Sequence, residues 1–513
     1  MNRSEALSGR AGADGVRWAL LAPPLRQVLR QELRGLLADP GALGACRLHR
    51  AKFKPGRKLS AWYEVGLNQD DQGHGHGPRG ASRQIAVTWT VPADATTRGR
   101  SAGDAAADRA ADGAALRMQA AASADGLAAP FNLLEAERPE LGMRVLVSPL
   151  DTSHPQLVRV SDPRHVREML LAAEATAAAG AGPGAAALRP APAYAVRAVR
   201  YRPGQRHVLR YDPLPSAGGG AGGGAAGTAR GPAVFAKLYR DGDGARAFRV
   251  AEPIAALLPP ADGGVTAARP LAYLPDDDVV LYGEVPGEPL VRRLGRPGGS
   301  AVLARHLARA GAALRALQGT APPPAAEVDL PSFGLRRELR SIARAAEHVG
   351  PMLPAAGARV VALLDRAAAL DERLPREAPG LAHGDYKADH LWVAPGGHSL
   401  TLIDFNTCSL AEPALDLGKF LADLHWWYAA TPRPSLEWAQ RQFLDGYAAA
   451  GRAPVPPERL RRARLYEALV LTKIIAHRVP VFDPAWRPRT TALLGRVDEV
   501  LAALEGGAGV RAG

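Results

Sequence analysis

The spacing of apolar and polar residues divides the chain into a strand-rich N-terminal part and a helical C-terminal part. Segment 48–67 predicts two strands joined by a Pro-Gly turn, and further strands are expected over 85–91 and 144–149. From Ala301 onward, apolar residues recur every three or four positions. This spacing predicts helices over 302–317, 335–349, 358–374, 415–428, 436–450, 457–477 and 489–504. Earlier helices are expected before residue 50 and over 102–122, so we predict an α+β protein.

The strand-rich part contains a motif that recurs. Residues 52–63 and 200–211 both read as a basic and aromatic hairpin with a Pro-Gly turn, and each is followed by a Gly-rich insert and a strand, at 85–91 and 233–239. The segment that starts at Arg144 also parallels the one that starts at Val279. Three corresponding segments in the same order favour an internal duplication, although hairpins with Pro-Gly turns are also common as independent elements.

The two copies differ at one chemically important position. The strand of the second copy contains Lys237, whereas the strand of the first copy has no lysine. Lys237 is the only lysine between Lys58 and Lys387, in a chain that uses arginine for nearly every other cation. Because an ammonium and a guanidinium are not interchangeable at a phosphate site, Lys237 is a candidate phosphate ligand, and an ordinary surface lysine is the alternative.

The densest group of chemically active residues lies between Leu381 and Leu410. His383-Gly384-Asp385 is followed by Lys387, Asp389 and His390, then by a short apolar run, a Pro-Gly-Gly turn, a second apolar run and Asp404. This order predicts a hairpin with one acid near each strand. Two carboxylates at the rim of a hairpin can serve as a base and as a cation ligand.

This arrangement resembles the aminoglycoside phosphotransferase family of small-molecule kinases, which has a protein-kinase-like fold. In that family a His-Gly-Asp loop, with Asn five residues after the Asp, precedes an Ile-Asp-Phe segment. Here the acids are Asp385 and Asp404, and His390 occupies the Asn position. The resemblance covers about residues 194–430 directly.

The resemblance implies a two-lobed fold with an antiparallel-sheet N-lobe and a mostly helical C-lobe, plus an additional degenerate N-lobe-like N-terminal domain. We expect a cap over residues 1–190, a nucleotide-binding N-lobe and hinge over 191–290, and a helical C-lobe with the catalytic and metal-binding loops over 291–513.

The activity implied by the resemblance is transfer of the γ-phosphate of ATP to a hydroxyl of a small molecule, such as an aminoglycoside, a sugar or an amino alcohol. Asp385 would orient the acceptor hydroxyl, Lys387 would contact the transferred phosphate, and His383 would brace the loop. Asp404 would bind Mg²⁺. His390 is either a second metal ligand, which would make Mn²⁺ possible, or a hydrogen-bonded loop residue.

The nucleotide would be held by residues of the second copy. Lys237 would contact its phosphates with Glu252 as the supporting acid, and the turn residues Gly204, Gln205 and Arg206 would lie over them. Gly283, Glu284 and Val285 would form the linker that reads the adenine edge. The Trp426-Trp427-Tyr428 cluster could stack on a sugar or belong to the core.

Two functions other than small-molecule phosphorylation are conceivable for this sequence. A pseudokinase that binds a nucleotide or ligand without turnover is the main alternative, motivated by His390 and the unusual cap. A protein substrate is disfavoured because no activation segment with an Ala-Pro-Glu end is recognisable.

Composition and charge indicate which kinds of partner and which compartment to expect. The net charge of +13 comes from arginines spread along all 513 residues, without a basic block interleaved with aromatics, so we expect no nucleic-acid partner. The two cysteines are far apart in sequence and fit a reducing compartment. No apolar signal core or membrane-spanning run is apparent, so we expect a cytoplasmic protein.

Overall fold

The structure is a computed structural model. In it the chain forms two compact units. The first unit comprises Met1–Arg246, Pro270–Glu284 and Pro480–Asp483, and the second comprises Ala247–Arg269, Val285–Val479 and Pro484–Gly513. The residues described are 3–68, 82–90, 102–179, 188, 191–215, 232–258, 264–294, 301–324, 328–429, 433–477 and 483–507.

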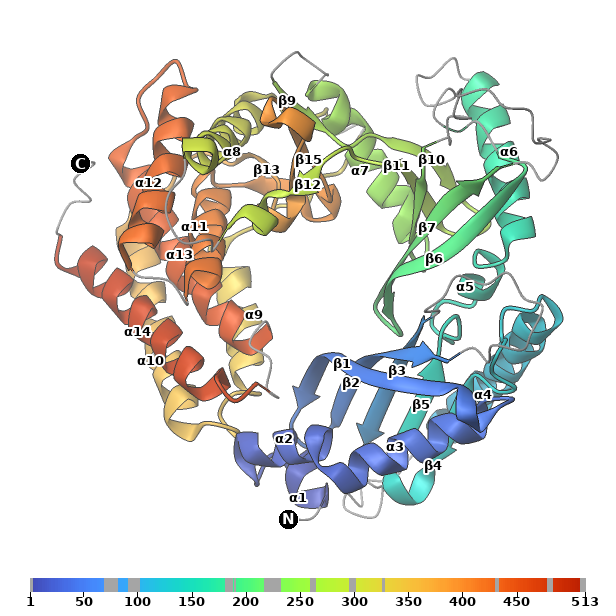
Figure 1. Cartoon of the computed structure of the whole chain (residues 1–513). Helices are drawn as coiled ribbons and strands as arrows, with labels where there is room; N and C mark the ends of the chain where they lie inside the picture. The colour runs from blue at the N-terminus through green and yellow to red at the C-terminus, as the bar shows by residue number, and fades with distance from the viewer. Residues whose placement is uncertain are drawn as a thin grey trace. The chain divides into compact units, whose positions relative to one another are not determined.

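The first unit contains two antiparallel sheets and the helices that cover them (Figure 1). Its helices are α1 (Arg3–Ser8), α2 (Gly12–Leu21), α3 (Pro23–Leu36), α4 (Ala102–Ala124), α5 (Gln156–Arg159) and α6 (Pro163–Ala179). The first sheet consists of β1 (Leu43–Lys54), β2 (Lys58–Leu67), β3 (Ser82–Thr90), β4 (Glu135–Arg138) and β5 (Met143–Val147). The second sheet consists of β6 (Ala193–Arg202), β7 (Arg206–Leu214), β8 (Val234–Leu238), β10 (Pro270–Leu274) and β11 (Val279–Gly283).

The two sheets have the same topology. Their strand orders are β1-β2-β3-β5-β4 and β6-β7-β8-β11-β10, and every neighbouring pair is antiparallel. In each case a helix follows the third strand along the chain, α4 after β3 and α7 (Asp243–Leu257) after β8. Both sheets therefore match in strand order, strand direction and helix position, as an internal duplication would produce.

The first hairpins of the two sheets also match in their turns. A Pro-Gly-X tip connects the paired residues Lys54 and Lys58 in one sheet and Arg202 and Arg206 in the other. The tip glycines, Gly56 and Gly204, have φ of 69° and 71°, a conformation that L side chains rarely adopt. The Pro-Gly signal in the sequence therefore has the same backbone cause in both hairpins.

Each sheet buries one face against helices. In the first sheet, Leu59, Val65 and Val87 alternate with more exposed residues and are fully buried, and α3 runs along this sheet in Figure 1. In the second sheet, Leu209, Ala236 and Leu281 share a core with residues of α6. The opposite face carries polar residues, among them Lys52 and Ser60 in the first sheet and Lys237 in the second.

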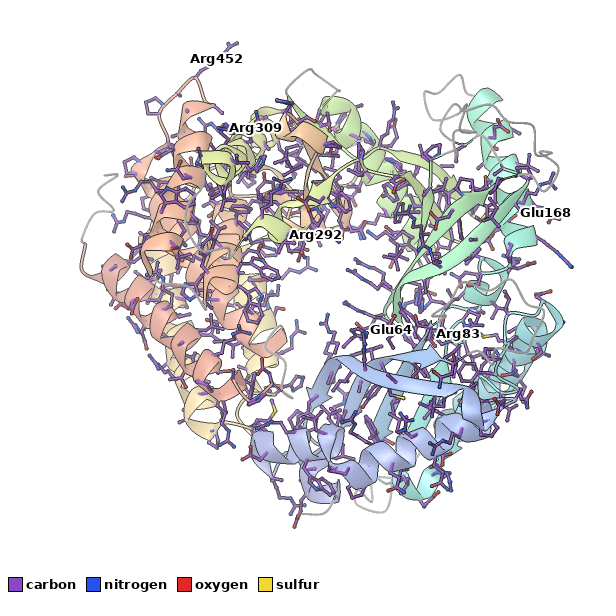
Figure 2. All side chains as sticks on the ribbon, in the orientation of Figure 1. Glu64, Arg83, Glu168, Arg292, Arg309 and Arg452 are labelled. Atoms are coloured by element: carbon purple, nitrogen blue, oxygen red, sulfur yellow. The ribbon has the colours of Figure 1, made fainter. Side chains whose placement is uncertain are left out.

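Loop segments are tied to the first sheet by side-chain hydrogen bonds. Arg83 on β3, labelled in Figure 2, donates to the carbonyl oxygens of Leu127 and Ala129 at 2.7 and 2.6 Å. Gln119 accepts a hydrogen bond from the Leu134 amide at 2.6 Å. These bonds fix the segment between α4 and β4 against the sheet.

The second unit is mostly helical. Its helices are α8 (Ala301–Gly319), α9 (Leu335–Ala346), α10 (Pro354–Arg373), α11 (Ala414–Tyr428), α12 (Arg433–Ala449), α13 (Pro457–His477) and α14 (Trp486–Glu505). Its short strands are β9 (Val265–Ala267), β12 (Glu288–Pro289), β13 (Gly380–Ala382), β14 (Leu391–Val393), β15 (Leu400–Leu402) and β16 (Ser409–Ala411). Close packing includes α11 on α13 through Gly418, where an added Cβ would lie 2.4 Å from the Tyr466 Cβ.

The α+β class, the antiparallel sheets and the helical C-terminal region agree with the sequence prediction. Helix α13 has the predicted bounds, and the other C-terminal helices differ from prediction only at their ends. Strand β4 was not predicted, because Glu-Ala-Glu-Arg has no apolar alternation. Helix α6 was also missed, and so were the short strands β9 and β10.

Candidate functional site

The His383 loop is braced by a buried acid from the following helix. Both carboxylate oxygens of Asp416 accept backbone hydrogen bonds, from the His383 amide at 2.7 Å and the Gly384 amide at 2.9 Å. Asp416 is fully buried, and burial raises its pKa. The bracing role of Asp416 was not predicted from the sequence. The available signal was an acid in the first turn of a helix that is mostly apolar.

His383 supports the loop through both ring nitrogens. Its Nε2 lies 3.0 Å from the Ile403 carbonyl oxygen and must donate, so Nδ1 is free to accept from the Asp385 amide at 3.3 Å. Gly384 has φ of 75°, and a Cβ there would lie 2.0 Å from the Thr407 carbonyl oxygen. Only glycine fits between these neighbours, which explains the sequence His383-Gly384-Asp385 locally.

Asp385 follows Gly384 in this loop and lies near the ammonium groups of Lys387 and Lys419. Its Oδ2 lies 2.5 Å from Lys387 Nζ, and 39% of its side chain is exposed. Burial acts to raise the pKa of Asp385, but nearby cations, including Lys387 and Lys419, lower it, so the pKa lies below its usual value. An ionised carboxylate that is partly open to solvent can accept a proton or a hydrogen bond from a bound hydroxyl.

The predicted hairpin is present and carries Asp404 at its end. Strands β14 and β15 pair from Leu391 with Leu402 to Val393 with Leu400, and both glycines of the Pro-Gly-Gly turn have positive φ. Asp404 itself has φ of 66°, which is uncommon for a residue other than glycine. Such strained backbone positions cluster at functional sites.

His390 lies between the two acids. Its Nδ1 is 3.0 Å from the Asp385 carbonyl oxygen, and its Nε2 is 3.6 Å from Asp404 Oδ2. A carbonyl oxygen can only accept, so Nδ1 carries the proton in that bond and a neutral ring presents its Nε2 lone pair toward Asp404. Burial lowers the pKa of His390 to about 3, and the charge of Lys387 acts in the same direction.

This donor set fits a divalent cation. A neutral imidazole nitrogen and a carboxylate oxygen face each other at 3.6 Å, where neither can donate to the other. The Nδ1 hydrogen bond to a backbone carbonyl is the support that metal-binding histidines normally have. Asp404 and His390 are thus the residues that could hold a metal.

A small cavity adjoins Asp385. It has a volume of about 160 Å³, and its charged lining residues are Glu338, Asp385, Lys387, Lys419, Asp423 and Lys473. Lys473 pairs with Glu338 at 2.7 Å, and Lys419 donates to the Gly384 carbonyl oxygen. Sequence reasoning missed these two lysines, although their rarity in this chain was a usable signal.

In the first unit, strand pairing places Lys237 between two apolar residues. It lies on β8 opposite Val208 of β7 and Val280 of β11, with 9% of its surface exposed. Its Nζ is 5.7 Å from the centre of the Tyr239 ring. The supporting acid predicted for it, Glu252, forms an ion pair with Arg269.

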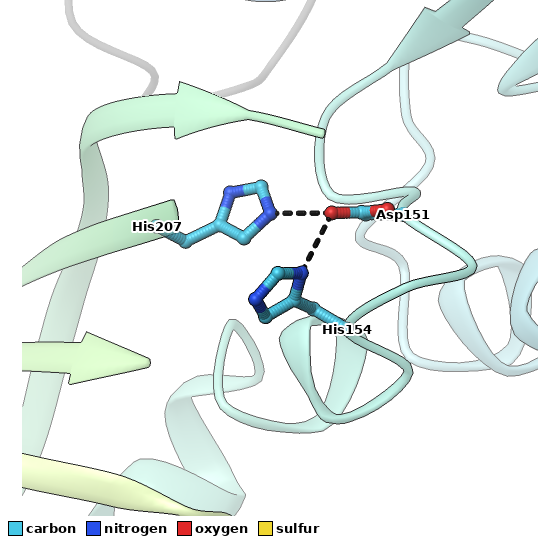
Figure 3. A group of neighbouring side chains, drawn as sticks. All are labelled: Asp151, His154 and His207. Atoms are coloured by element: carbon cyan, nitrogen blue, oxygen red, sulfur yellow. Dashed lines mark hydrogen bonds and ion pairs between the residues drawn. The ribbon is translucent and has the colours of Figure 1, made fainter. Parts of the chain in front are cut away.

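The turn before Arg206 is anchored by a buried cluster, shown in Figure 3. Asp151 Oδ2 lies 2.7 Å from His207 Nε2 and 2.9 Å from His154 Nδ1, and it accepts from the Gly204 amide at 2.9 Å. Burial raises the pKa of Asp151, but these hydrogen bonds lower it by more, so its pKa lies well below the usual range. Burial also lowers the pKa of His207.

We interpret this cluster as hydrogen-bonded rather than metal-binding. Two ligand atoms of a tetrahedral site with bonds of about 2.0–2.1 Å lie about 3.3 Å apart. The separations of 2.7 and 2.9 Å between Asp151 and the two histidines are instead those of hydrogen bonds. The cluster fixes the predicted phosphate-covering turn, and sequence reasoning missed it because Asp151 and His207 are far apart in the chain.

The predicted linker lies at the unit boundary. Gly283 ends β11, the Glu284 amide donates to the Ala233 carbonyl oxygen at 3.1 Å, and the second unit resumes at Val285. Glu284 also pairs with Arg210 at 3.0 Å.

Comparison with known proteins gives the family. The model of the phosphotransferase enzyme family matches residues 225–466, which include Lys237, Asp385 and Asp404. This part of the chain belongs to the phosphotransferase enzyme family. The resemblance inferred from the acidic hairpin is therefore confirmed. A search of curated proteins returned no match.

Solved structures similar to this chain have low sequence identity. A choline/ethanolamine kinase family protein from Mesorhizobium loti is 18% identical, with a TM-score of 0.41, and the match covers 66% of this chain and all of that protein. An amicoumacin kinase in complex with AMP-PNP and Ca²⁺ is 14% identical, with a TM-score of 0.40 and coverage of 60% and 88%. Spectinomycin phosphotransferase in complex with ADP is 14% identical, with a TM-score of 0.38 and coverage of 60% and 93%.

The aromatic cluster of the phosphotransferase segment has structural contacts. Trp427 Nε1 donates to Asp423 at 3.2 Å, Arg489 stacks 4.8 Å from the centre of the Trp426 ring, and Tyr428 is buried. These contacts favour the core interpretation over a sugar platform. Among the described helices, none is both long and apolar enough to cross a membrane.

Proposed function

We propose that this protein transfers the γ-phosphate of ATP to a hydroxyl group of a small molecule. The observation that carries the proposal is the pair of acids around His390, within a segment that matches the phosphotransferase family. Phosphoryl transfer needs positioned phosphates, a divalent cation and an oriented acceptor more than covalent help from the protein. The acidic hairpin offers groups for the last two of these requirements.

In this proposal Asp385 accepts the hydrogen bond of the acceptor hydroxyl and takes its proton as the phosphate bond forms. Lys387, 2.5 Å from Asp385, keeps that carboxylate ionised and faces the transferred phosphate. His383 and Asp416 hold the loop and do not exchange protons with the substrate.

Asp404 and His390 would bind the divalent cation, which neutralises the charge of the nucleotide phosphates when it is bound. Lys237 would bind the phosphates from the second sheet, with Glu252 as the supporting acid of the sequence hypothesis. Gly204, Gln205 and Arg206 would cover them. Gly283, Glu284 and Val285 would read the nucleotide base, and we propose two lobes with residues 1–190 as a degenerate N-lobe-like cap.

The cavity beside Asp385 is where we expect the acceptor. Three ammonium groups line a space of about 160 Å³, and each already lies near an acid or a carbonyl oxygen. Three acids, Glu338, Asp385 and Asp423, line the same space, so its formal charges balance and do not select between cationic and anionic acceptors. We therefore propose a small hydroxyl compound, such as an aminoglycoside, a sugar or an amino alcohol, as the acceptor.

The activity test is ATP consumption across a panel of neutral, acidic and polycationic hydroxyl compounds. Asp385→Asn should lower kcat by roughly 10²- to 10⁴-fold, because it removes the base. Asp365→Asn, an exposed acid on α10, is the matched control and should keep wild-type rates. Nucleotide binding without any turnover that depends on Asp385 would support the pseudokinase instead.

The metal assignment has its own test. An imidazole ligand suits Mn²⁺ better than Mg²⁺, so His390→Asn should shift the ratio of Mg²⁺- to Mn²⁺-supported activity toward Mg²⁺ by roughly tenfold. His398→Asn, in the exposed turn of the same hairpin, is the control. An unchanged ratio in His390→Asn would exclude His390 as a ligand.

A further inference from the structure

A second cavity lies on the polar face of the first sheet, far along the chain from the acidic hairpin. It has a volume of about 370 Å³ and is lined by Lys52, Lys54, Lys58, Arg144 and Trp62, among others. We call it the basic pocket. Cavities of this size hold small ligands rather than extended polymers.

Strand pairing explains why these side chains share one face. Lys54 lies opposite Lys58, Lys52 lies opposite Ser60, and Thr88 lies between Ser60 and Arg144. Directly paired residues of antiparallel strands project from the same side of a sheet. The pocket is thus a regular product of strand alternation in the first sheet.

The charged residues that line the basic pocket are all positive. Three of the seven lysines in the sequence line it, and none of its lining residues is acidic. Within the described part of the chain, no acid pairs with Lys52, Lys54 or Lys58. Like charges directly opposite each other destabilise a sheet, so Lys54 and Lys58 are costly to keep without an anion.

The neighbouring groups point to the same conclusion. Burial lowers the pKa of Lys52, and Lys54, Arg50 and Lys58 act in the same direction. Trp62 lines the pocket, but its Nε1 has no exposed surface, and the residue belongs to an apolar core cluster. The hydroxyls of Ser60 and Thr88 lie 3.3 Å apart and also line the pocket. The lysines and these hydroxyls are therefore the lining donors available to an anion.

The pocket is completed by the turn of the second sheet. Pro203, Gly204 and Gln205 contribute to its lining, and Asp151 holds Gly204 in place through the hydrogen bond of the buried cluster. The pocket therefore has two walls: a lysine-bearing sheet face and a fixed turn.

Comparison of the two sheets adds a positional argument. Counting from the hairpin tips, the row Lys52, Ser60, Thr88 and Arg144 in the first sheet corresponds to the row Arg200, Val208, Lys237 and Val280 in the second. Thr88 thus occupies the position of Lys237. In the first sheet the cations flank this position, on the first and fourth strands.

We propose that the basic pocket binds a small phosphate-bearing molecule, held by Lys52, Lys54 and Lys58 with the hydroxyls of Ser60 and Thr88 as additional donors. A compact ammonium is a suitable partner for phosphate oxygens, and several together fit two or more phosphate groups. The pocket shares Gly204 and Gln205 with the turn proposed to cover the nucleotide phosphates, but its lysines have no role in the proposed catalysis, and the proposal does not require that the protein transfers phosphate. Inorganic polyphosphates and phosphorylated metabolites share this chemistry.

The test is calorimetric titration of the full chain with inorganic pyrophosphate, tripolyphosphate and a sugar bisphosphate. Lys237→Met serves as the background, so that phosphates do not bind through that lysine. Lys52→Met should weaken binding roughly tenfold or more, because it removes a charged partner. Arg47→Met, which removes one charge from an exposed position of the same strand, should change affinity by less than about twofold.

A second variant separates binding from folding defects. Lys58→Met removes a second charged partner, on the strand opposite Lys54, and should weaken binding by roughly three- to tenfold. Thermal unfolding of each variant confirms that it is folded. Comparing the polyphosphates with the sugar bisphosphate distinguishes the two possible sources of the ligand.

Three results would overturn the proposal. They are the absence of saturable binding of every phosphate probe, equal effects of Lys52→Met and Arg47→Met, and binding of citrate as tight as that of tripolyphosphate. The first would remove the site, the second would reduce it to nonspecific charge, and the third would remove the preference for phosphate.

Discussion

The two sheets of the first unit share a topology but differ in where they place positive charge. In the second sheet the row that contains Lys237 also holds Val208 and Val280 beside it and Arg200 at its edge, so the buried lysine lies between two valines. The equivalent row of the first sheet has Lys52 and Arg144 at its sides and Thr88 at the centre. The same backbone can therefore present one focused cation or a broad basic surface, depending on which strand carries the charge.

The largest expected difference between the sheets concerns Lys237. Lys237→Met should lower kcat/KM for ATP by roughly 10²- to 10³-fold, as expected when one preorganised electrostatic contact to the reacting phosphates is lost. Steady-state kinetics with saturating acceptor measures this effect. Arg240→Met, at an exposed residue three positions later, should keep wild-type kinetics. Equal effects of the two variants would remove the distinction between the sheets.

The next-largest expected effect is on stability and concerns the buried cluster of Asp151, His154 and His207, which anchors the turn before Arg206. Asp151→Asn weakens charge-assisted hydrogen bonds from two buried histidines and should lower the free energy of unfolding by roughly 2–4 kcal/mol. Urea denaturation measures this change. Asp276→Asn, an exposed acid of the same unit, should stay within about 0.5 kcal/mol of wild type. If Asp151→Asn left the free energy of unfolding unchanged, the turn would not depend on the cluster.

The same cluster predicts a dependence of stability on pH. The pKa of His207 and that of Asp151 are both lowered in the folded state, so the unfolded chain binds more protons in acid. The stability that they contribute is present above the unfolded pKa values and is lost as pH falls. His207 should contribute a slope of at most about 1.4 kcal/mol per pH unit below roughly pH 6.5.

Denaturation of wild type and His207→Gln between pH 7 and 5 measures that slope. The variant should show a flatter profile over this range, because glutamine does not titrate. A profile identical to wild type would show that His207 is not buried in its neutral form.

The smallest effect concerns the paired lysines. Lys54→Met should raise the free energy of unfolding by about 0.5 kcal/mol in the absence of added anion, because it removes a repulsive cross-strand pair. Added tripolyphosphate should stabilise wild type more than the variant. Thermal unfolding with and without the anion measures both changes. A destabilised Lys54→Met protein without anion would contradict the repulsion argument.

Much of this arrangement was predictable from local sequence. The Pro-Gly turns of both first hairpins and the Pro-Gly-Gly turn before Leu400 mark strand reversals, because glycine takes positive φ there at little cost. Asp385 and Asp404 follow strands closely, so their hairpin could be predicted from the order of residues alone. Lys237 was found through the rarity of lysine.

Contacts between distant segments were less predictable. Asp151 meets His207 only because the chain returns through the second sheet, and Lys473 reaches Glu338 across two helices of the second unit. Three of the four residues of strand β4 are charged, and the strand forms by pairing with the edge of β5. None of these pairings leaves a periodic pattern in the sequence.

The most direct measurement is a crystal structure of the full chain with AMP-PNP, Mg²⁺ and tripolyphosphate. Our account predicts that the nucleotide phosphates contact Lys237 and share a metal ion with Asp404, and that tripolyphosphate occupies the basic pocket between Lys52 and Lys58. A nucleotide bound away from both Lys237 and Asp404 would contradict the assignment of the second sheet to catalysis.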